Sequence, residues 1–253
     1  MGDLHADSKA FDEERLKKWV GHISEFGGNA IAVCVGDYFN GQTPGHKHFD
    51  AGAMRDDYVL NLEGYVKHAL GHCERMLKPL TKAGVNTVLI EGNHDRMISA
   101  VGFTAMLSDR IGGTYLGNAG FIRAHCTPLY KTTGTPISVL YAHHGKKGGV
   151  TPGPKVNAMQ ALIGPYDADV YIAGHVHDAM LRVVNRRGVR RKGSSTEMVS
   201  RAVGLYRAPS FLSDTPTGYS TYGERNEYGA NDSGLMWLEV NPKLFTMQRH
   251  ELL

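Results

Sequence analysis

The sequence predicts an α/β fold that forms a single domain over residues 1–253. Short apolar runs alternate with amphipathic helical segments, and the last third of the chain is rich in strand-forming residues without helical periodicity. A chain of this length can fold around one large core. Alternating strands and helices followed by more strands indicate a layered α/β architecture.

Three segments are predicted to be helical. Residues 16–23 and 58–80 carry apolar side chains at helical spacing, and residues 156–163 form a third helical stretch. Apolar positions that recur every three or four residues place one face of each helix against the core.

Four apolar runs are too short for helices and are predicted to be buried strands. They occur in the segments NAIAVCVGD, NTVLIEGNHD, ISVLYAHHG and ADVYIAGHVH. In the C-terminal third, the segment LRVVNRRGVRRKG predicts a hairpin that turns near Arg187 and Gly188.

Composition limits the protein class. A net charge of +3 is too small to identify a partner, so a nucleic-acid interaction must depend on local clusters of charge. Three cysteines without CxxC spacing predict a reducing compartment and no disulfide framework. The sequence shows no membrane-spanning run and no signal peptide, so we expect a cytoplasmic protein that does not contact membranes.

Each of the four apolar runs ends in polar side chains that can bind a metal ion. Ligands of open α/β sheets collect beyond the carboxyl ends of the strands, so these tips are expected to converge. The opening DLH offers two more such groups. The candidates are Asp3, His5, Asp37, Asn40, Asn93, His94, Asp95, His143, His144, His175 and His177.

Carboxylate, amide and imidazole groups together suit Mn²⁺, Fe²⁺ or Zn²⁺, and the lack of thiolates argues against a structural zinc site. The candidates exceed what one ion requires, which favours two metals. Two ions about 3.5–4 Å apart can hold the attacking and leaving oxygens of a phosphoryl transfer.

Taken in order, DLH, GDYFN, GNHD, a histidine before glycine, and GHVH resemble the signature of the calcineurin-like metallophosphoesterase superfamily. The resemblance spans residues 3–177, and it is specific because five motifs occur in the correct order. It implies a four-layer α/β/β/α sandwich of two mixed sheets. It is nearest to stand-alone phosphoesterases of phage or prophage type, related to the repair nucleases of the superfamily.

The resemblance also implies the ligands of two divalent cations, with Mn²⁺ preferred and Fe²⁺, Zn²⁺ or Ni²⁺ as alternatives. The first metal would be held by Asp3, His5, Asp37 and His177. The second would be held by Asp37, Asn93, His175 and either His143 or His144, of which His143 is preferred. Asp37 would bridge the two.

In the same resemblance, a hydroxide between the metals is the nucleophile. His94 donates a proton to the leaving group, and Asp95 orients the ring of His94. The expected function is metal-dependent phosphoester hydrolysis, with a phosphodiester of DNA or RNA as the first substrate class. A phosphomonoesterase or protein phosphatase is the alternative enzyme. A catalytically silent scaffold or virion-associated interaction protein is the alternative from another class.

Substrate contacts are predicted from polar residues around these motifs. They are Asn40, Lys146, Lys147, Arg190 and Arg191. The lysines lie in a glycine-rich stretch after His144, where a plain flexible loop is an equal alternative. The arginines belong to a basic hairpin that could follow a phosphodiester backbone or could be an ordinary solvated surface.

The position of the DLH motif is unusual, since only Met1 and Gly2 precede Asp3. In the family this motif ends a central strand, so the N-terminal strand is expected to be missing from a longer natural chain. If the chain does begin at Met1, Asp3 and His5 are expected to lie on a loose terminus.

Overall fold

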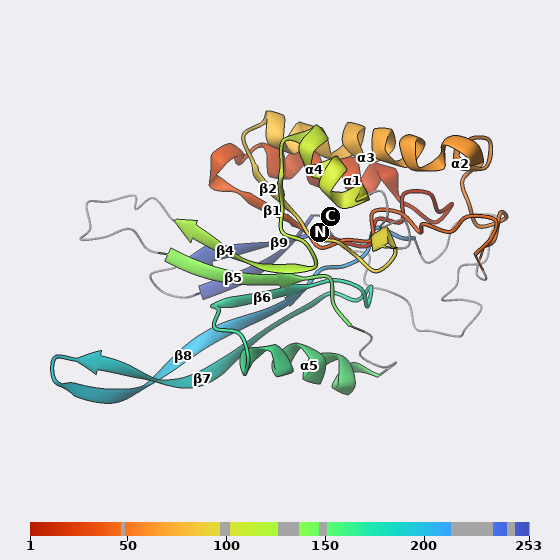
Figure 1. The fold of residues 1–253 in the computed structure, drawn as a ribbon. Helices are drawn as coiled ribbons and strands as arrows, with labels where there is room; N and C mark the ends of the chain where they lie inside the picture. Colours follow the sequence, from red (N-terminus) through yellow and green to blue (C-terminus); the bar gives the residue numbers. More distant parts are fainter. Residues whose placement is uncertain are drawn as a thin grey trace.

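The protein forms four layers in the order helix, sheet, sheet, helix, as Figure 1 shows for the computed structural model. The structure describes residues 1–46, 49–96, 102–125, 137–146, 151–213, 235–241 and 246–252. This architecture confirms the α/β/β/α sandwich.

The first sheet has the strand order β1-β2-β3, and both pairings are parallel. Its strands are β1 (Ile31–Cys34), β2 (Asn86–Leu89) and β3 (Thr114–Tyr115). The helices above it are α1 (Glu13–Ser24), α3 (Tyr65–Lys82) and α4 (Phe103–Ile111). A short 3-10 turn, η1 (Gly27–Asn29), links α1 to β1. The largest buried cluster, which includes Leu16, Leu77 and Leu107, holds these helices on the sheet.

The predicted helix over residues 58–80 is interrupted. The structure has α2 (Asp56–Val59), a 3-10 turn η2 (Leu62–Gly64) and then α3. Asn61 ends the first helix by donating its side-chain amide to the carbonyl of Asp57 at 2.6 Å. Such local bonds compete with the helical backbone pattern, and they explain the break.

The second sheet is mixed and has the order β4-β5-β6-β8-β7. Its strands are β4 (Ala119–His125), β5 (Ile137–His143), β6 (Val170–Ala173), β7 (Met180–Lys192) and β8 (Ser195–Arg207). Helix α5 (Pro152–Gln160), followed by η4 (Ala161–Ile163), covers its outer face. A separate antiparallel pair joins β9 (Leu235–Asn241) to β10 (Thr246–Leu252).

Alternation along β5 and β6 supplies two separate cores. Ala142 and Ile172 pack between the two sheets, whereas Tyr141 and Tyr171 face the side that α5 covers. Successive residues of a strand point to opposite faces, so each strand contributes to both cores.

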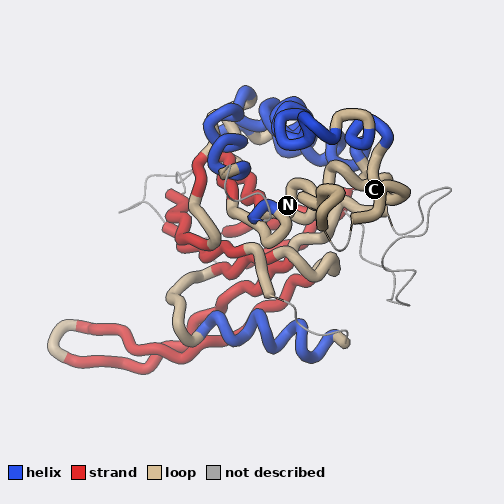
Figure 2. The backbone as a smooth tube through the Cα atoms, turned by 45° about the vertical axis from the view of Figure 1, so that its right-hand side comes forward, coloured by secondary structure: helices blue, strands red, loops and turns tan. Residues whose placement is uncertain are grey.

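The β7–β8 hairpin extends out of the body of the protein (Figures 1 and 2). Lys192 pairs with Ser195, so the chain turns at Gly193 and Ser194, and the predicted turn near Arg187 and Gly188 is wrong. Gly193 has a φ of 61°, a left-handed conformation that glycine adopts without steric cost. Gly188 instead continues β7 opposite Val199.

The first residues of the chain are fixed beside β1. The amino group of Met1 donates to the Val33 carbonyl at 2.7 Å, and the N–H of Val35 donates to the Met1 carbonyl at 2.8 Å. The N–H of Asp3 donates to the Gly36 carbonyl at 2.9 Å. The expectation of a loose terminus is therefore wrong, because these backbone bonds continue the strand pattern of the first sheet.

Cys34 and Cys73 are buried free thiols, and Cys126 lies outside the described part. No described helix is both long enough and apolar enough to cross a membrane.

Replacing Leu77 with Ala tests the packing of α3 on the first sheet. Leu77 is fully buried, so its truncation is expected to lower the free energy of unfolding by about 2–5 kcal/mol. Leu60 is 84% exposed, and the matched Leu60→Ala change is expected to have a small effect. Urea unfolding followed by circular dichroism measures both; equal losses would contradict this packing.

Candidate metal centre

The polar tips of β1, β2, β5 and β6 meet at one edge of the two sheets together with the N-terminal segment. The described residues contain two groups of three possible ligands, and within each group the ligand atoms all lie within 4.8 Å of one another. The first group is Asp3, His5 and His177, and the second is Asp37, His144 and His175. Segments far apart in the sequence thus bring carboxylate and imidazole groups together.

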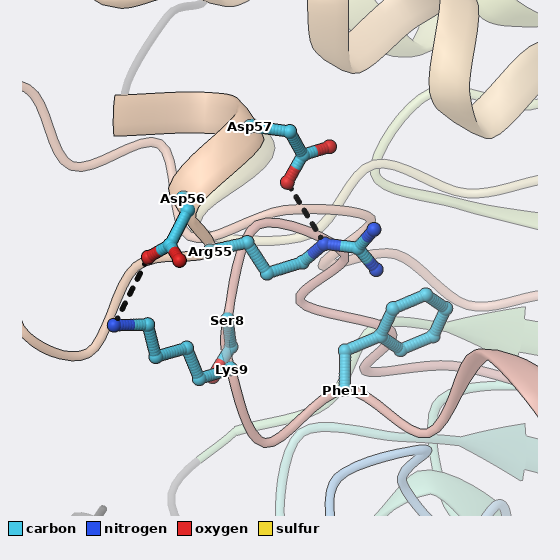
Figure 3. A pocket seen from close by; sticks show the side chains of 6 residues that line it. All are labelled: Ser8, Lys9, Phe11, Arg55, Asp56 and Asp57. Carbon is cyan, nitrogen blue, oxygen red and sulfur yellow. Dashed lines mark hydrogen bonds and ion pairs between the residues drawn. The ribbon is translucent and has the colours of Figure 1, made fainter. Parts of the chain in front are cut away.

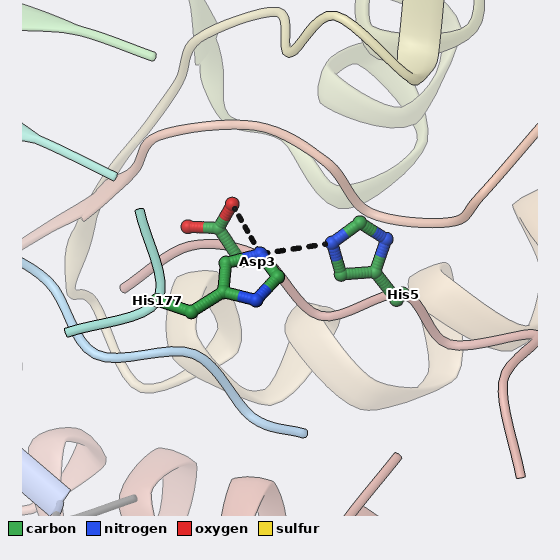
Figure 4. A group of neighbouring side chains, drawn as sticks. All are labelled: Asp3, His5 and His177. Carbon is green, nitrogen blue, oxygen red and sulfur yellow. Dashed lines mark hydrogen bonds and ion pairs between the residues drawn. The ribbon is translucent and has the colours of Figure 1, made fainter. Parts of the chain in front are cut away.

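In the first group, the Nε2 atoms of two imidazoles face each other (Figure 4). Nε2 of His5 lies 3.4 Å from Nε2 of His177, which lies 3.4 Å from Oδ1 of Asp3. The other Asp3 oxygen, Oδ2, accepts the backbone N–H of His175 at 2.9 Å. Asp3 therefore links the first group to His175, which belongs to the second group.

In the second group, two oxygen atoms and one imidazole nitrogen surround Nε2 of His144. They are Oδ1 of Asn93 at 2.9 Å, Oδ2 of Asp37 at 3.1 Å and Nδ1 of His175 at 3.2 Å. A single N–H at Nε2 can form a good hydrogen bond to only one of these three atoms. The contact at 2.9 Å adds the amide oxygen of Asn93 to the second group.

The donor set fits a divalent cation. Nδ1 of His144 donates to the Val35 carbonyl at 2.6 Å, which makes Nε2 the atom that faces Asp37 and Asn93. Metal-ligating histidines commonly hold their second nitrogen in this way. A cation placed among the four atoms would satisfy acceptors that a single proton cannot. The residues that would hold it are Asp37, Asn93, His144 and His175.

Backbone strain is concentrated in the same residues. Among the described residues, the non-glycine positions with positive φ are Asp3, His5, Asp37, His175 and His177, at 45° to 73°. This left-handed region is uncommon for residues other than glycine. Strained backbone persists where surrounding structure holds it, and it clusters at functional sites. All five are predicted metal ligands.

Two glycines allow the ends of β1 and β2 to approach each other. A Cβ on Gly92 would overlap the backbone nitrogen and the Oδ1 of Asp37, and one on Gly36 would overlap the backbone of Gly92. Gly36 also has a φ of 95°. Only glycine fits at positions 36 and 92, where the two loops approach each other.

The structure places His144 in the centre, and it places the preferred candidate His143 elsewhere. His143 lies on the same face of β5 as Tyr141, with ring centroids 5.9 Å apart, and its Nε2 has no hydrogen-bond partner. His144 follows Ala142 on the face between the sheets. Because adjacent strand residues point to opposite faces, only one of the two histidines can reach the centre.

His94 lies beside both groups. Its ring centroid is 5.0 Å from that of His5, and its Nε2 is 4.0 Å from Oδ2 of Asp37. Its Nδ1 donates to the backbone carbonyl of Asn40 at 2.8 Å. The ring is thus held by Asn40 and directs Nε2 toward the centre.

Asp95 does not contact the His94 ring, so the prediction that it orients this ring is wrong. Its carboxylate accepts the backbone N–H groups of Asp37 at 2.9 Å, Tyr38 at 2.9 Å and Gly92 at 2.8 Å. Burial, and then the charge of Asp37, raise the pKa of Asp95, while the N–H groups of Gly92 and Tyr38 oppose this rise. Asp95 joins the loops that follow β1 and β2.

The predicted substrate contacts are spread more widely. Lys146 is exposed two residues after His144, and Lys147 lies outside the described residues. Arg190 and Arg191 are in β7 near the tip of the hairpin, with the Arg191 side chain exposed. From Met180 to Arg191 a strand spans roughly 35 Å. The two arginines therefore lie far from the metal centre.

One buried acidic residue was missed. Asp7 is 1% exposed, and its Oδ1 accepts the backbone N–H of Asn40 at 2.7 Å and the side-chain amide of Asn40 at 3.1 Å. The alternation of Asp3, His5 and Asp7 in DLHAD was a sequence signal for it. A shallow surface pocket next to this segment shares no residue with the metal centre (Figure 3). Its lining is Ser8, Lys9, Phe11, Arg55, Asp56 and Asp57.

Charge interactions within the centre set its protonation. Burial lowers the pKa of His144, but its hydrogen bond to Asp37 and the charges of Asp3 and Asp37 raise it to about 9. Burial, followed by the nearby His94, lowers the pKa of His5 to about 3. Burial opposes the ionisation of Asp37, yet the bond from His144 holds its pKa well below the ordinary value. Without metal, His144 is therefore protonated at neutral pH.

Metal affinity is expected to increase with pH. Because His144 must lose its proton to act as a ligand, affinity for Mn²⁺ should fall below pH 9 by about tenfold per pH unit for each displaced proton. Isothermal titration in buffers of different ionisation enthalpy measures both affinity and proton release. Affinity that stays constant from pH 6 to pH 9 would contradict the protonated state of His144.

Gly92→Ala is expected to disrupt the centre. The added Cβ would displace Asp37, which should weaken Mn²⁺ binding and cost about 1–3 kcal/mol in unfolding free energy. Gly188→Ala is the matched control, since a Cβ there meets no atom within 4 Å. Calorimetry and thermal melting compare the two; similar behaviour would argue against the close approach.

The family match agrees with this geometry. Residues 1–179 match the family of calcineurin-like phosphoesterases, and no curated protein matches the chain. Among solved structures, a double mutant of Vps29 from Entamoeba histolytica is similar at 13% identity. That alignment covers 100% of this chain and 97% of the other, with a TM-score of 0.44. Because the family match covers most of the chain and every predicted metal ligand, the protein belongs to the calcineurin-like phosphoesterase family.

Proposed function

We propose that the protein is a metal-dependent phosphoester hydrolase that uses two divalent cations, with a phosphodiester of nucleic acid as its substrate class. The observation that carries the proposal is the convergence of two ligand groups, Asp3–His5–His177 and Asp37–His144–His175, on one site. His94 lies beside both groups with Nε2 free of the Asn40 bond.

The ligand assignment follows from the two groups. Asp3, His5 and His177 would hold one cation, and Asn93, His144 and His175 would hold the other, with Asp37 shared between them. Mn²⁺ is the preferred metal, and Fe²⁺, Zn²⁺ and Ni²⁺ suit the same mixture of oxygen and nitrogen ligands. When bound, such cations neutralise charge on the phosphate and lower the pKa of water.

The remaining chemistry belongs to His94. A phosphoester breaks when an oxygen from water bonds to phosphorus and the ester oxygen leaves. The leaving oxygen requires a proton, and we assign its donation to Nε2 of His94, which lies 4.0 Å from Oδ2 of Asp37. The bond from Nδ1 to the Asn40 carbonyl persists in both protonation states of the ring, so His94 can donate without reorienting.

Support for a nucleic-acid diester comes from the GDYFN motif and from positive charge. The motif resembles the form found in phosphodiesterases, and Lys146 is exposed beside the centre. The basic residues of the hairpin could contact a polymer at a distance from the cleaved bond, since electrostatic attraction to phosphates needs no base contact.

The experiment that tests this function is a panel of substrates assayed with Mn²⁺. The protein is expected to cleave bis-(p-nitrophenyl) phosphate and single-stranded DNA faster than p-nitrophenyl phosphate. Asp37→Asn should abolish the activity because the shared ligand loses its charge. The reverse substrate order would refute the diesterase assignment, and Mn²⁺ binding without any cleavage would favour a silent member of the fold.

His144→Ala and His143→Ala distinguish the two adjacent histidines. Losing His144 removes a ligand and should weaken Mn²⁺ binding by at least about 10-fold, whereas losing His143 should change it little. Equilibrium dialysis gives the number of bound ions and their affinities. A larger loss for His143→Ala would reverse the assignment.

A further inference from the structure

We propose that Asp7 and Tyr65 are positioning residues that hold the proton donor His94 in place through Asn40. This inference rests on the proposed hydrolase function and extends it to residues outside the five motifs. The groups form a continuous chain of hydrogen bonds in the order Tyr65, Asp7, Asn40, His94.

This series of hydrogen bonds begins at Tyr65, the first residue of α3. The hydroxyl of Tyr65 donates to Oδ2 of Asp7 through a short hydrogen bond. Tyr65 is itself fixed by aromatic neighbours, with ring centroids 5.8 Å from Phe39 and 5.7 Å from Tyr58. The helix thereby sets the position of the buried carboxylate.

Asp7 in turn fixes Asn40 at two points. Its Oδ1 accepts both the backbone N–H and the side-chain amide of Asn40, at 2.7 and 3.1 Å. Binding both groups restricts rotation of this residue, so the direction of its carbonyl is also set. That carbonyl accepts Nδ1–H of His94 at 2.8 Å. A carbonyl can only accept, which requires the proton on Nδ1 and leaves Nε2 for the leaving group.

The burial of Asp7 argues for a role beyond stability. A carboxylate that is 1% exposed is costly to bury, and its donors here are a hydroxyl and two amide groups without charge. Apolar packing would stabilise this position at lower cost. Retaining a buried acid that organises the contact to His94 is consistent with selection for orientation.

Asp7→Asn and Tyr65→Phe test this role, with Tyr58→Phe as the matched control. Tyr58 is also buried, but its hydroxyl bonds to Nδ1 of His72 and not to Asp7. Each tyrosine change removes one oxygen from a buried ring, so a general loss of packing would affect both alike. Tyr65→Phe keeps the test valid if Asp7→Asn does not fold.

The first readout is the dependence of rate on the leaving group. A nitrophenolate leaves with little need for a proton, whereas an alkoxide requires one. Asp7→Asn should lower kcat about 10- to 100-fold for an alkyl ester and less than about threefold for the corresponding nitrophenyl ester. Tyr65→Phe should act in the same direction with a smaller change, and Tyr58→Phe should change neither rate. In a His94→Ala background, Asp7→Asn should cause no further loss.

The second readout does not depend on activity. Ring ¹⁵N shifts of His94 in the metal-free protein, assigned with His94→Ala, should show Nδ1–H in the wild type and a tautomer mixture in Asp7→Asn. Unchanged shifts, or equal losses for both esters, would overturn the inference. If the wild type cleaves neither ester, the proposed function fails, and the ¹⁵N spectra alone decide whether Asp7 holds the ring.

Discussion

The centre depends first on the carboxylate of Asp95, which accepts three backbone N–H groups from the loops that follow the parallel strands β1 and β2. Its oxygens join the loop containing Asp37 and Tyr38 to the loop containing Gly92. The close approach of Gly36 and Gly92 makes this possible. A fully buried acceptor of this kind makes movement of either loop costly, because the freed N–H groups would be left without partners.

The contact between these two loops also fixes the positions of residues in the candidate metal centre. Asp37 has a left-handed backbone and its Oδ1 accepts the backbone N–H of His94 at 2.9 Å, so this bond fixes the two residues relative to each other. Strain at Asp3, His5, His175 and His177 is of the same kind. The sandwich of two sheets and its cores holds these residues in conformations that isolated peptides would avoid.

Carboxylates and histidines are crowded together in the buried space of the centre. Asp3 and Asp37 stay ionised because His177 and His144 hydrogen-bond to them, and burial alone would favour their neutral forms. The carbonyls of Val35 and Asn40 accept Nδ1–H of His144 and of His94, which directs Nε2 of each ring toward the centre.

The class of fold, the strands that end in polar tips and most of the candidate residues around the centre follow from the amino-acid sequence alone. Apolar runs and the order of motifs are properties of the sequence itself, so they are visible before the fold is known. Sequence spacing did not decide between His143 and His144, because the choice depends on which face of β5 meets the first sheet. The partners of Asp95 and Asn40 were likewise decided by tertiary structure, since they lie on strands and loops far apart in the chain. The hairpin turn and the break before α3 depended on local backbone bonds and conformations that periodicity does not encode.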